Sequence, residues 1–233
     1  MHKFYHKLEL EIIYKDEYFV AINKPHGLLT HRSKYADDAK IFAVQELRNQ
    51  LGQYVYPCHR IDRKTSGVLL FSLSEHTNSL MQQQFTAHKV AKKYIAIVRG
   101  HTKNKETIDY PLTNEKGKKQ DAVTHYKTLK QTEIEVPFGK FNTSRYSLVE
   151  AYPQTGRYHQ IRKHFDHIFH PIIGDRPHGC NKQNRLFKER WNMMTMMLHA
   201  SEISFTHPVT NAETTIKANI SNEFKRVMDI MAW

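Results

Sequence analysis

The sequence predicts an α+β fold with one large, mainly antiparallel mixed sheet and flanking helices. Short β-branched or alternating apolar runs bounded by turn residues outnumber the helical patterns. These runs mostly follow one another directly, whereas a doubly wound parallel sheet alternates strand and helix. With 233 residues, 39% of them apolar and 25% charged, the chain has the composition of an ordinary globular protein that can bury a proper core.

The first expected elements are a hairpin and a helix. Residues 8–14 and 18–23 are predicted to be strands joined by a short turn, and Pro25 in "NKPHGL" ends the second. Residues 39–51 carry apolar side chains at helical spacing, including Ile41, and Gly52 closes this helix.

The remaining elements alternate less regularly. A second helix begins after Ser74, which has the side chain of an N-cap residue, and the last helix begins at Ser221. A helix is also predicted from about Tyr158. Five further runs are expected as strands, namely "KKYIAIVRG", "DAVTHYKTL", "SRYSLVEAY", "MMLHASEISF" and "TTIKANI".

The chain shows no internal repeat and no long linker, so residues 8–233 are predicted to form a single domain after a short N-terminal extension, residues 1–7. Cys58 and Cys180 do not form a CxxC pair, and no stretch of eighteen apolar residues occurs. We therefore expect a cytoplasmic protein without membrane contact, and a monomer.

The formal net charge of +12, with sixteen histidines counted as neutral, indicates a polyanionic partner, nucleic acid before an anionic membrane. A charge that serves only solubility is the alternative.

The motif "HRIDRKTSG", residues 59–67, places one acid between two arginines just before an apolar run. Flanking cations favour the ionised form of a carboxylate, so Asp62 is a candidate nucleophile or base. The alternative is a solvated turn in which Asp62 only binds local backbone amides. The strand that follows favours a functional site, because it would hold the loop on a rigid edge.

A second cluster is "TGRYHQIRKHF", residues 155–165. On a helix, Tyr158, Ile161 and Phe165 would share one stripe, and a cationic face would lie beside them. Because arginine holds carboxylates bidentately, Arg162 is a candidate partner for Asp62. The alternative is a solvated basic helix face.

Neither a metal nor a cofactor is predicted. His164, His167 and His170 recur every third residue, but no further ligands complete a recognisable zinc set. No glycine-rich phosphate-binding loop occurs.

Taken in order, "NKPHGLLTH", "HRIDRKTSG", "KKYIAIVRG", "GRYHQIRKH" and "HPIIGD" resemble the signatures of the RluA-type pseudouridine synthases over roughly residues 20–205. Further stretches such as "GDRPHG" and "LHAS", without an S4-type RNA-binding domain before the first strand, are similar to the branch that modifies uridine 65 of tRNA. The chain departs from the pattern at Ile61, where Leu is typical, at Phe169, where many relatives have Gly, and at His178, where many have Tyr.

The resemblance implies a pseudouridine synthase fold whose sheet is split into two halves, with a central active-site cleft. It implies an RNA pseudouridine synthase, an isomerase that needs no cofactor or metal. Asp62 would be the nucleophile, Arg162 its cationic partner and Tyr94 the aromatic support of the base.

The expected substrate is tRNA, at position 65 in the region of the acceptor and T stems. Arg60 would enter the helix where the base has left, and phosphates would be bound by Lys24, Arg63, Lys92, Lys93 and Lys163. A sister enzyme that acts on ribosomal RNA, or an RNA-binding protein without catalysis, is the alternative.

Overall fold

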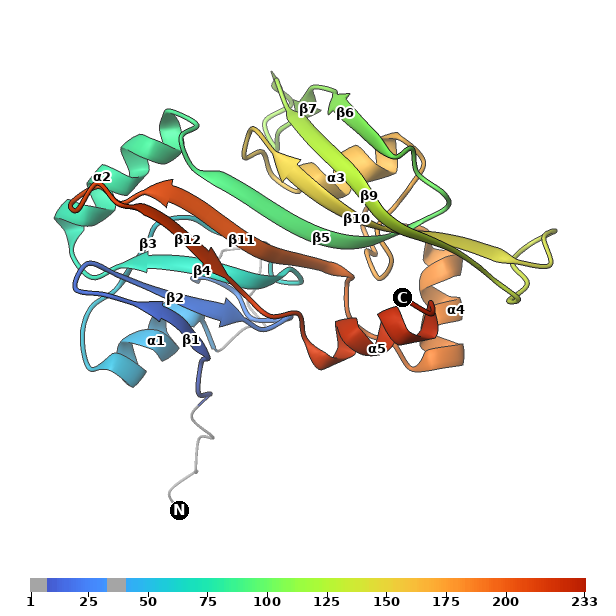
Figure 1. Cartoon of the computed structure of the whole chain (residues 1–233), viewed down its shortest axis with the longest axis horizontal. Helices are drawn as coiled ribbons and strands as arrows, with labels where there is room; N and C mark the ends of the chain where they lie inside the picture. Colours follow the sequence, from blue (N-terminus) through green and yellow to red (C-terminus); the bar gives the residue numbers. More distant parts are fainter. Residues whose placement is uncertain (1–7, 33–40) are drawn as a thin grey trace, which may run out of the picture. The chain divides into compact units, whose positions relative to one another are not determined.

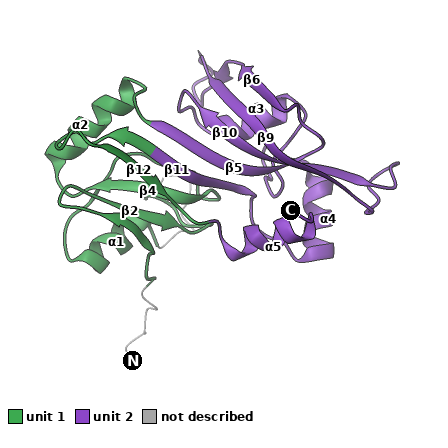
Figure 2. Ribbon diagram, viewed as in Figure 1, with its two compact units in different colours: residues 1–90, 204–219 green, residues 91–203, 220–233 purple. Residues whose placement is uncertain are grey.

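The structure is a computed structural model that describes residues 8–32 and 41–233, and the chain divides into two compact units (Figures 1 and 2). Unit 1 takes residues 1–90 and 204–219, and unit 2 takes residues 91–203 and 220–233. A division into two halves is what the family resemblance implied, while the single domain over residues 8–233 stays a prediction. The predicted extension, residues 1–7, lies outside the described residues.

Unit 1 is built on antiparallel strands in the order β1-β2-β4. β3 pairs with β4, and β12 pairs with β11, of which residues 204–206 belong to unit 1. Every residue of β4 is buried, as expected for a strand that reads as a continuous apolar run. The strands are β1 (Ile12–Lys15), β2 (Phe19–Lys24), β3 (Tyr56–Pro57), β4 (Ser66–Ser72), β11 (Leu198–Thr206) and β12 (Glu213–Lys217).

Within its described residues, unit 1 has two helices. α1 (Ala43–Leu51) buries Leu47 in a core shared with β2 and β4, and Gly52 ends it in the left-handed conformation, as predicted. Ile41 lies before this helix and is exposed, so its predicted place on the apolar face is wrong. α2 (Glu75–Thr86) begins at the predicted N-cap, where the Ser74 side chain accepts a hydrogen bond from the Thr77 amide.

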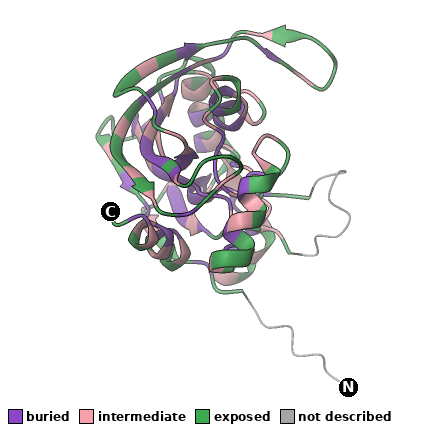
Figure 3. Cartoon of the chain, turned by 90° about the vertical axis from the view of Figure 1, so that its right-hand side faces the viewer, coloured by how far each residue is buried: buried purple, intermediate pink, exposed green. Residues whose placement is uncertain are grey.

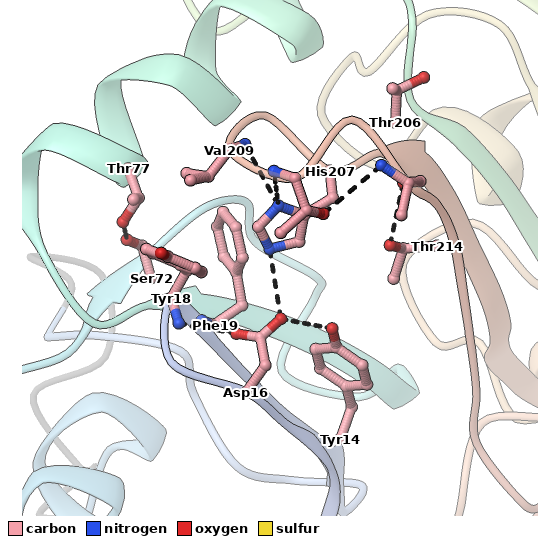
Figure 4. A network of polar contacts seen from close by, with 12 residues as sticks. Tyr14, Asp16, Tyr18, Phe19, Ser72, Thr77, Thr206, His207, Val209 and Thr214 are labelled. Carbon is pink, nitrogen blue, oxygen red and sulfur yellow. Dashed lines mark hydrogen bonds and ion pairs between the residues drawn. The ribbon is translucent and has the colours of Figure 1, made fainter.

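A buried polar network ties two turns of unit 1 together (Figure 4). His207 follows β11, and its Nε2 lies 3.2 Å from Oδ2 of Asp16 in the β1–β2 turn. Its Nδ1 accepts hydrogen bonds from the amides of Val209 and Thr210, so Nε2 carries the proton that faces Asp16. Asp16 also accepts from the Tyr14 hydroxyl. The contact of Asp16 with His207 connects the predicted β1–β2 turn to the β11–β12 hairpin, a connection that the sequence did not predict.

Unit 2 contains a second antiparallel system in the order β5-β10-β9-β6, with residues 198–203 of β11 on the other side of β5. β7 and β8 form a separate two-stranded sheet. The strands are β5 (Ala91–Arg99), β6 (Lys105–Asp109), β7 (Leu112–Thr113), β8 (Lys119–Gln120), β9 (Val123–Ile134) and β10 (Ser144–Pro153).

Helices cover both faces of this sheet. Because side chains alternate between the two faces of β5 and both faces are buried, the middle of β5 is apolar at every position. Ala96 and Val98 lie in a core with α3 (Gln160–His167), whereas Ile97 lies in another core with α4 (Asn181–Trp191) and α5 (Asn222–Ile230). Figure 3 shows how burial alternates with exposure along the chain.

The predicted α+β class with a mainly antiparallel sheet is confirmed. The five strands predicted as quoted runs are present as β5, β9, β10, β11 and β12, and the last helix begins after the predicted cap Ser221. The helix predicted from Tyr158 begins at Gln160 instead, so Tyr158 leaves the apolar stripe and is 48% exposed. Across residues 8–32 and 41–233, no helix is both long and apolar enough to cross a membrane.

Candidate functional site

The loop between β3 and β4 carries Asp62 and is clamped by a buried lysine. Lys24, at the end of β2, is 0% exposed. Its Nζ donates hydrogen bonds to the carbonyls of Pro25 at 3.0 Å, Leu28 at 2.8 Å and Arg63 at 3.2 Å. Three acceptors match the three donors of an ammonium group, so Lys24 joins its own loop to the loop of Asp62.

Backbone contacts strengthen the same junction. The amide of Gly27 donates to the Arg63 carbonyl at 2.8 Å, and Nε of Arg63 donates back to the Gly27 carbonyl at 3.1 Å. The Thr65 amide donates to the Asp62 carbonyl at 3.0 Å, which closes a tight turn at the start of β4. Asp62 therefore sits on a rigid loop, as the sequence predicted from the strand that follows.

Positive charge gathers around this loop. Burial lowers the pKa of Lys24 to about 7, and the nearby negative charge of Asp62 opposes that shift. Burial, followed by the charges of Lys24, Lys64 and Arg63, lowers the pKa of His26 to about 4, so this imidazole is neutral at neutral pH. Asp62 thus lies near the cations of two neighbouring loops.

The proposed phosphate contact of Lys24 needs correction. A side chain that is fully buried and bonded to three carbonyls does not present its ammonium to an RNA backbone. Its role is to position the loop. Arg60 and Arg63 are exposed, in keeping with their predicted contacts.

A pH-dependent stability follows from Lys24. Above about pH 7 the folded protein has lost the Lys24 proton, whereas an unfolded lysine keeps its proton to about pH 10.4. Because the unfolded state then binds more protons, the free energy of unfolding should rise with pH in this window, by up to about 1.4 kcal/mol per pH unit. Below pH 7 the lysine is charged in both states and contributes no slope.

Urea unfolding of the wild type and of Lys24→Met from pH 6 to pH 10 measures this effect. The difference between the two free energies should be flat below pH 7 and should change in favour of the wild type above it. Lys225→Met, which removes an exposed lysine of α5, is the control and should follow the wild type. A difference that is flat over the whole range contradicts the assignment.

Unit 2 holds the second cluster, around Arg162 in α3. Arg162 is 4% exposed, and its Nε and one Nη donate to the two carboxylate oxygens of Asp175 at 2.7 and 2.8 Å. This bidentate pair fixes the plane of the guanidinium and uses two of its five N–H donors.

Asp175 was not named in the sequence prediction, although it ends the motif "HPIIGD". Gly174 before it has φ +81°, and a Cβ there would lie 2.1 Å from the Thr195 carbonyl, so only glycine is accommodated. Asn184 of α4 accepts from the Gly174 amide at 2.8 Å and donates to the Asp175 carbonyl at 2.7 Å. The sequence did contain an indication of Asp175, because an acid directly after a glycine and an apolar run, as in "HPIIGD", is typical of a residue held in a tight turn.

Tyr94 lies on the face of β5 that α3 covers. Its ring packs against the core that contains Ala96, Val98 and Phe165, whereas Ile95 and Ile97 belong to the opposite core. α3 carries Arg162 on this same face of the sheet. The structure thus brings the predicted aromatic and the predicted cation to one side of unit 2.

The two adjacent lysines of β5 differ. Side chains alternate between the two faces of a strand, so Lys92, two residues before Tyr94, lies on the same face as Tyr94. Its Nζ reaches the Thr155 carbonyl at 3.5 Å, and burial lowers its pKa. Lys93 faces the other way and forms an ion pair with Glu202 at 3.0 Å.

Two histidines lie beside the Arg162 pair. Nδ1 of His159 and Nε2 of His178 are 2.8 Å apart, so one donates and the other accepts, and the two are not both protonated. Burial, followed by the charge of Arg162, lowers the pKa of His178. The departure of this chain from the family pattern at position 178 therefore places an imidazole with a lowered pKa next to Arg162.

Asp62 belongs to unit 1, whereas Arg162 and Tyr94 belong to unit 2. The pairing of Asp62 with Arg162 stays a prediction, as does the central cleft.

Comparison with known proteins identifies the family of these motifs. Residues 18–167 match the family described as RNA pseudouridylate synthase. The chain is 45% identical to tRNA pseudouridine synthase C of Vibrio parahaemolyticus, over 97% of this chain and 96% of that protein. The chain belongs to the RNA pseudouridylate synthase family. The protein of the same name from Haemophilus influenzae is 43% identical over 96% of this chain and 98% of its own length.

Solved structures agree on the fold of an RNA pseudouridylate synthase. Human RNA pseudouridylate synthase domain containing 4 matches with a TM-score of 0.72 at 23% identity, over 95% of this chain and 93% of that one. Human RNA pseudouridylate synthase domain containing 1 matches with a TM-score of 0.70 at 20% identity, over 96% and 95%. The predicted RluA-type family, fold and enzyme class, an isomerase, are confirmed.

Proposed function

We propose that this enzyme converts a uridine of tRNA, at position 65 in the region of the acceptor and T stems, into pseudouridine. The observation that carries the substrate is the similarity to proteins named tRNA pseudouridine synthase C, at 43–45% identity over nearly the whole chain. The strongly basic composition supports a polyanionic substrate.

The reaction is an internal rearrangement. The bond between C1′ of the ribose and N1 of uracil breaks, the base turns, and a bond forms between C1′ and C5. The C5 proton leaves and N1 gains a proton, so atoms and electrons balance without a redox partner. The groups that this needs are an ionised carboxylate, a cation that holds it, and support for the detached base.

The chain supplies these groups in the proposed roles. Asp62 is the nucleophile, and the loop that carries it is held by the hydrogen bond from Lys24 to the Arg63 carbonyl. Arg162 holds Asp62 with donors of the guanidinium that Asp175 does not use, and Tyr94 supports the base from the face of β5 on which Arg162 lies. In this proposal, Asp175 sets the orientation of Arg162 in advance of the substrate.

Contacts with the RNA would extend from this centre. A uridine in a stem must leave the stack, which costs a few kcal/mol, and Arg60 would enter the space that it vacates. Arg63, Lys92, Lys93 and Lys163 would contact phosphates, with an affinity that falls as salt rises. We further infer that the enzyme acts as a monomer in the cytoplasm, where it meets tRNA.

Incubation of the purified protein with unmodified tRNA and with ribosomal RNA fragments tests the proposal. We expect pseudouridine in tRNA at position 65, located by chemical marking, and none from free uridine, because the phosphates provide most of the binding energy. A tRNA with cytidine at position 65 is the matched control and should stay unmodified.

Modification confined to the ribosomal RNA fragments would keep the enzyme class and overturn the tRNA assignment. Binding of both RNAs without any pseudouridine would favour an RNA-binding protein and contradict the catalytic roles.

A further inference from the structure

The outward side of α3 carries aromatic rings near both ends and a lysine between them. Tyr158 precedes the helix, and its ring is stacked on His159 with centroids 3.7 Å apart. Nζ of Lys163, one helical turn further on, lies 5.5 Å from the Tyr158 ring centroid. His167, in the last turn, stacks on Tyr110 at 3.6 Å. Exposed rings accompanied by cations are typical of surfaces on which nucleobases stack.

The loop that presents Tyr158 is held rigidly from inside. The buried side chain of Gln160 accepts hydrogen bonds from the Thr155 hydroxyl and the Arg157 amide, and donates to the Val123 carbonyl. His159 takes the left-handed conformation at φ 56°, which turns the chain into α3. An exposed ring on a pinned loop loses little conformational freedom when a base stacks on it.

Further positive charge lies next to the middle of α3. Lys163 donates to the carbonyl of Thr113 in β7 at 3.4 Å. Thr113 pairs with Lys119 of β8, and the β7–β8 turn exposes Lys116 and Lys118 as well. The same segments carry acidic residues as well, so the charge around α3 is mixed, and Lys163 is the cation that lies over the Tyr158 ring. The acids are Asp109, Glu115, Asp121 and Asp166.

Phe169, at the other end of α3, has a conformation and an exposure that the fold does not explain. The His170 amide donates to the Phe165 carbonyl and the Phe169 amide donates to that of Asp166, which is the hydrogen-bond pattern of a Schellman motif. Phe169 occupies its left-handed position at φ 62°, where glycine is favoured and a bulky residue is strained. Its side chain is nevertheless 87% exposed, so no core contact offsets the strain.

We infer that Tyr158, Lys163, His167 and Phe169, together with Tyr110, form an RNA-docking surface, named here the α3 surface. Bases of the substrate that are unpaired or at the end of a stack contact the rings of Tyr158 and Phe169, and Lys163 holds a phosphate between them. This inference rests on the proposed function in taking RNA as the partner, and it adds a contact surface to the site of isomerisation.

Phe169→Gly separates this role from a structural one, because the two roles predict opposite effects. Relief of the strained backbone should raise the melting temperature by about 2–4 °C. Loss of a stacked base should weaken binding of an unmodified tRNA transcript by about fivefold or more, with the dependence on salt unchanged because the ring carries no charge.

His88→Gly is the matched control. His88 occupies the same left-handed position of a Schellman motif after α2, with φ 56° and an exposed side chain. It should gain similar thermal stability and bind tRNA as the wild type does. Tyr158→Ala should likewise weaken tRNA binding. Tyr54→Ala is its control and should not, because Tyr54 is also exposed beneath a cation, Arg48, at 4.9 Å.

Lys163→Gln should lower the slope of log affinity against log salt by about one, whereas Phe169→Gly should not. The inference is overturned if Phe169→Gly binds tRNA within twofold of the wild type or lowers the melting temperature. It is also overturned if the variant changes the oligomeric state of the protein in solution and leaves the affinity for RNA unchanged. If the wild type modifies ribosomal RNA and not tRNA, the proposed function fails, and the same variants are compared on the RNA that it modifies.

Discussion

Asp62→Asn should lower turnover on tRNA by about a thousandfold or more and leave RNA binding in place. The amide keeps the shape of the side chain and its capacity to accept hydrogen bonds, but it provides no attacking anion. The loop should keep its conformation, because the contacts that hold it are made by Lys24 and by the backbones of Gly27 and Arg63. The effect should therefore appear in kcat and not in the affinity for tRNA.

Single-turnover isomerisation and equilibrium binding, measured on the same preparation, test this prediction. Asp229→Asn is the charge-matched control, since it removes one exposed carboxylate from α5 and should retain full turnover. Turnover of Asp62→Asn within tenfold of the wild type would exclude Asp62 as the nucleophile. A large loss of binding, with turnover of the bound RNA unchanged, would assign it to RNA contact.

Much of the fold could be predicted because local chemistry and tertiary structure agree. Ser74 and Ser221 cap their helices as their side chains suggest, and the alternating runs of β5 and β10 become central strands. α4 was missed because only Gln183 and Phe187 of its eleven residues are buried, which leaves almost no apolar period to detect. The two-residue strands β7 and β8 are too short for any pattern.

The sequence indicated candidate reacting residues but not the residues that hold them in the structure. Asp62 and Arg162 stand out because their motifs concentrate charge. Lys24 reads as one more surface cation, and only the three-dimensional meeting of two loops reveals the three carbonyls around its ammonium. Asp175 lies thirteen residues from Arg162, a separation that no helical or strand period connects.

The positions of Tyr158 and Phe169 show a different limit. Helical periodicity assigned Tyr158 to the core, but the left-handed His159 delays the start of α3 and turns the ring outward. Phe169 stands where the helix end favours glycine, so local preference and sequence disagree. Such disagreements are frequent at functional positions, and both residues belong to the α3 surface.

Arg162→Lys should raise the barrier of isomerisation by roughly 2–4 kcal/mol, or lower kcat by roughly 30- to 1,000-fold. Arg162 is held in one plane by the bidentate contact with Asp175, and the proposed contact with Asp62 depends on that plane. A lysine ammonium is a point charge that cannot bind both oxygens of Asp175 and hold a second carboxylate at a fixed angle. Asp175→Asn should act in the same direction with a smaller effect, because an amide offers one acceptor oxygen in place of two.

Arg226→Lys provides the matched comparison, since Arg226 makes the same bidentate contact with Glu223, at 2.7 Å for both bonds, on the more exposed α5. It should keep full turnover and tRNA affinity. The melting temperature of each variant separates loss of fold from loss of chemistry, and Asp175→Asn retains the test if Arg162→Lys does not fold. Arg162 acts by orienting Asp62 if kcat falls in Arg162→Lys and Asp175→Asn while tRNA affinity stays within about threefold. Equal losses of affinity in both variants, with kcat unchanged, would instead make this buried pair part of the RNA-binding surface and remove it from the catalytic centre.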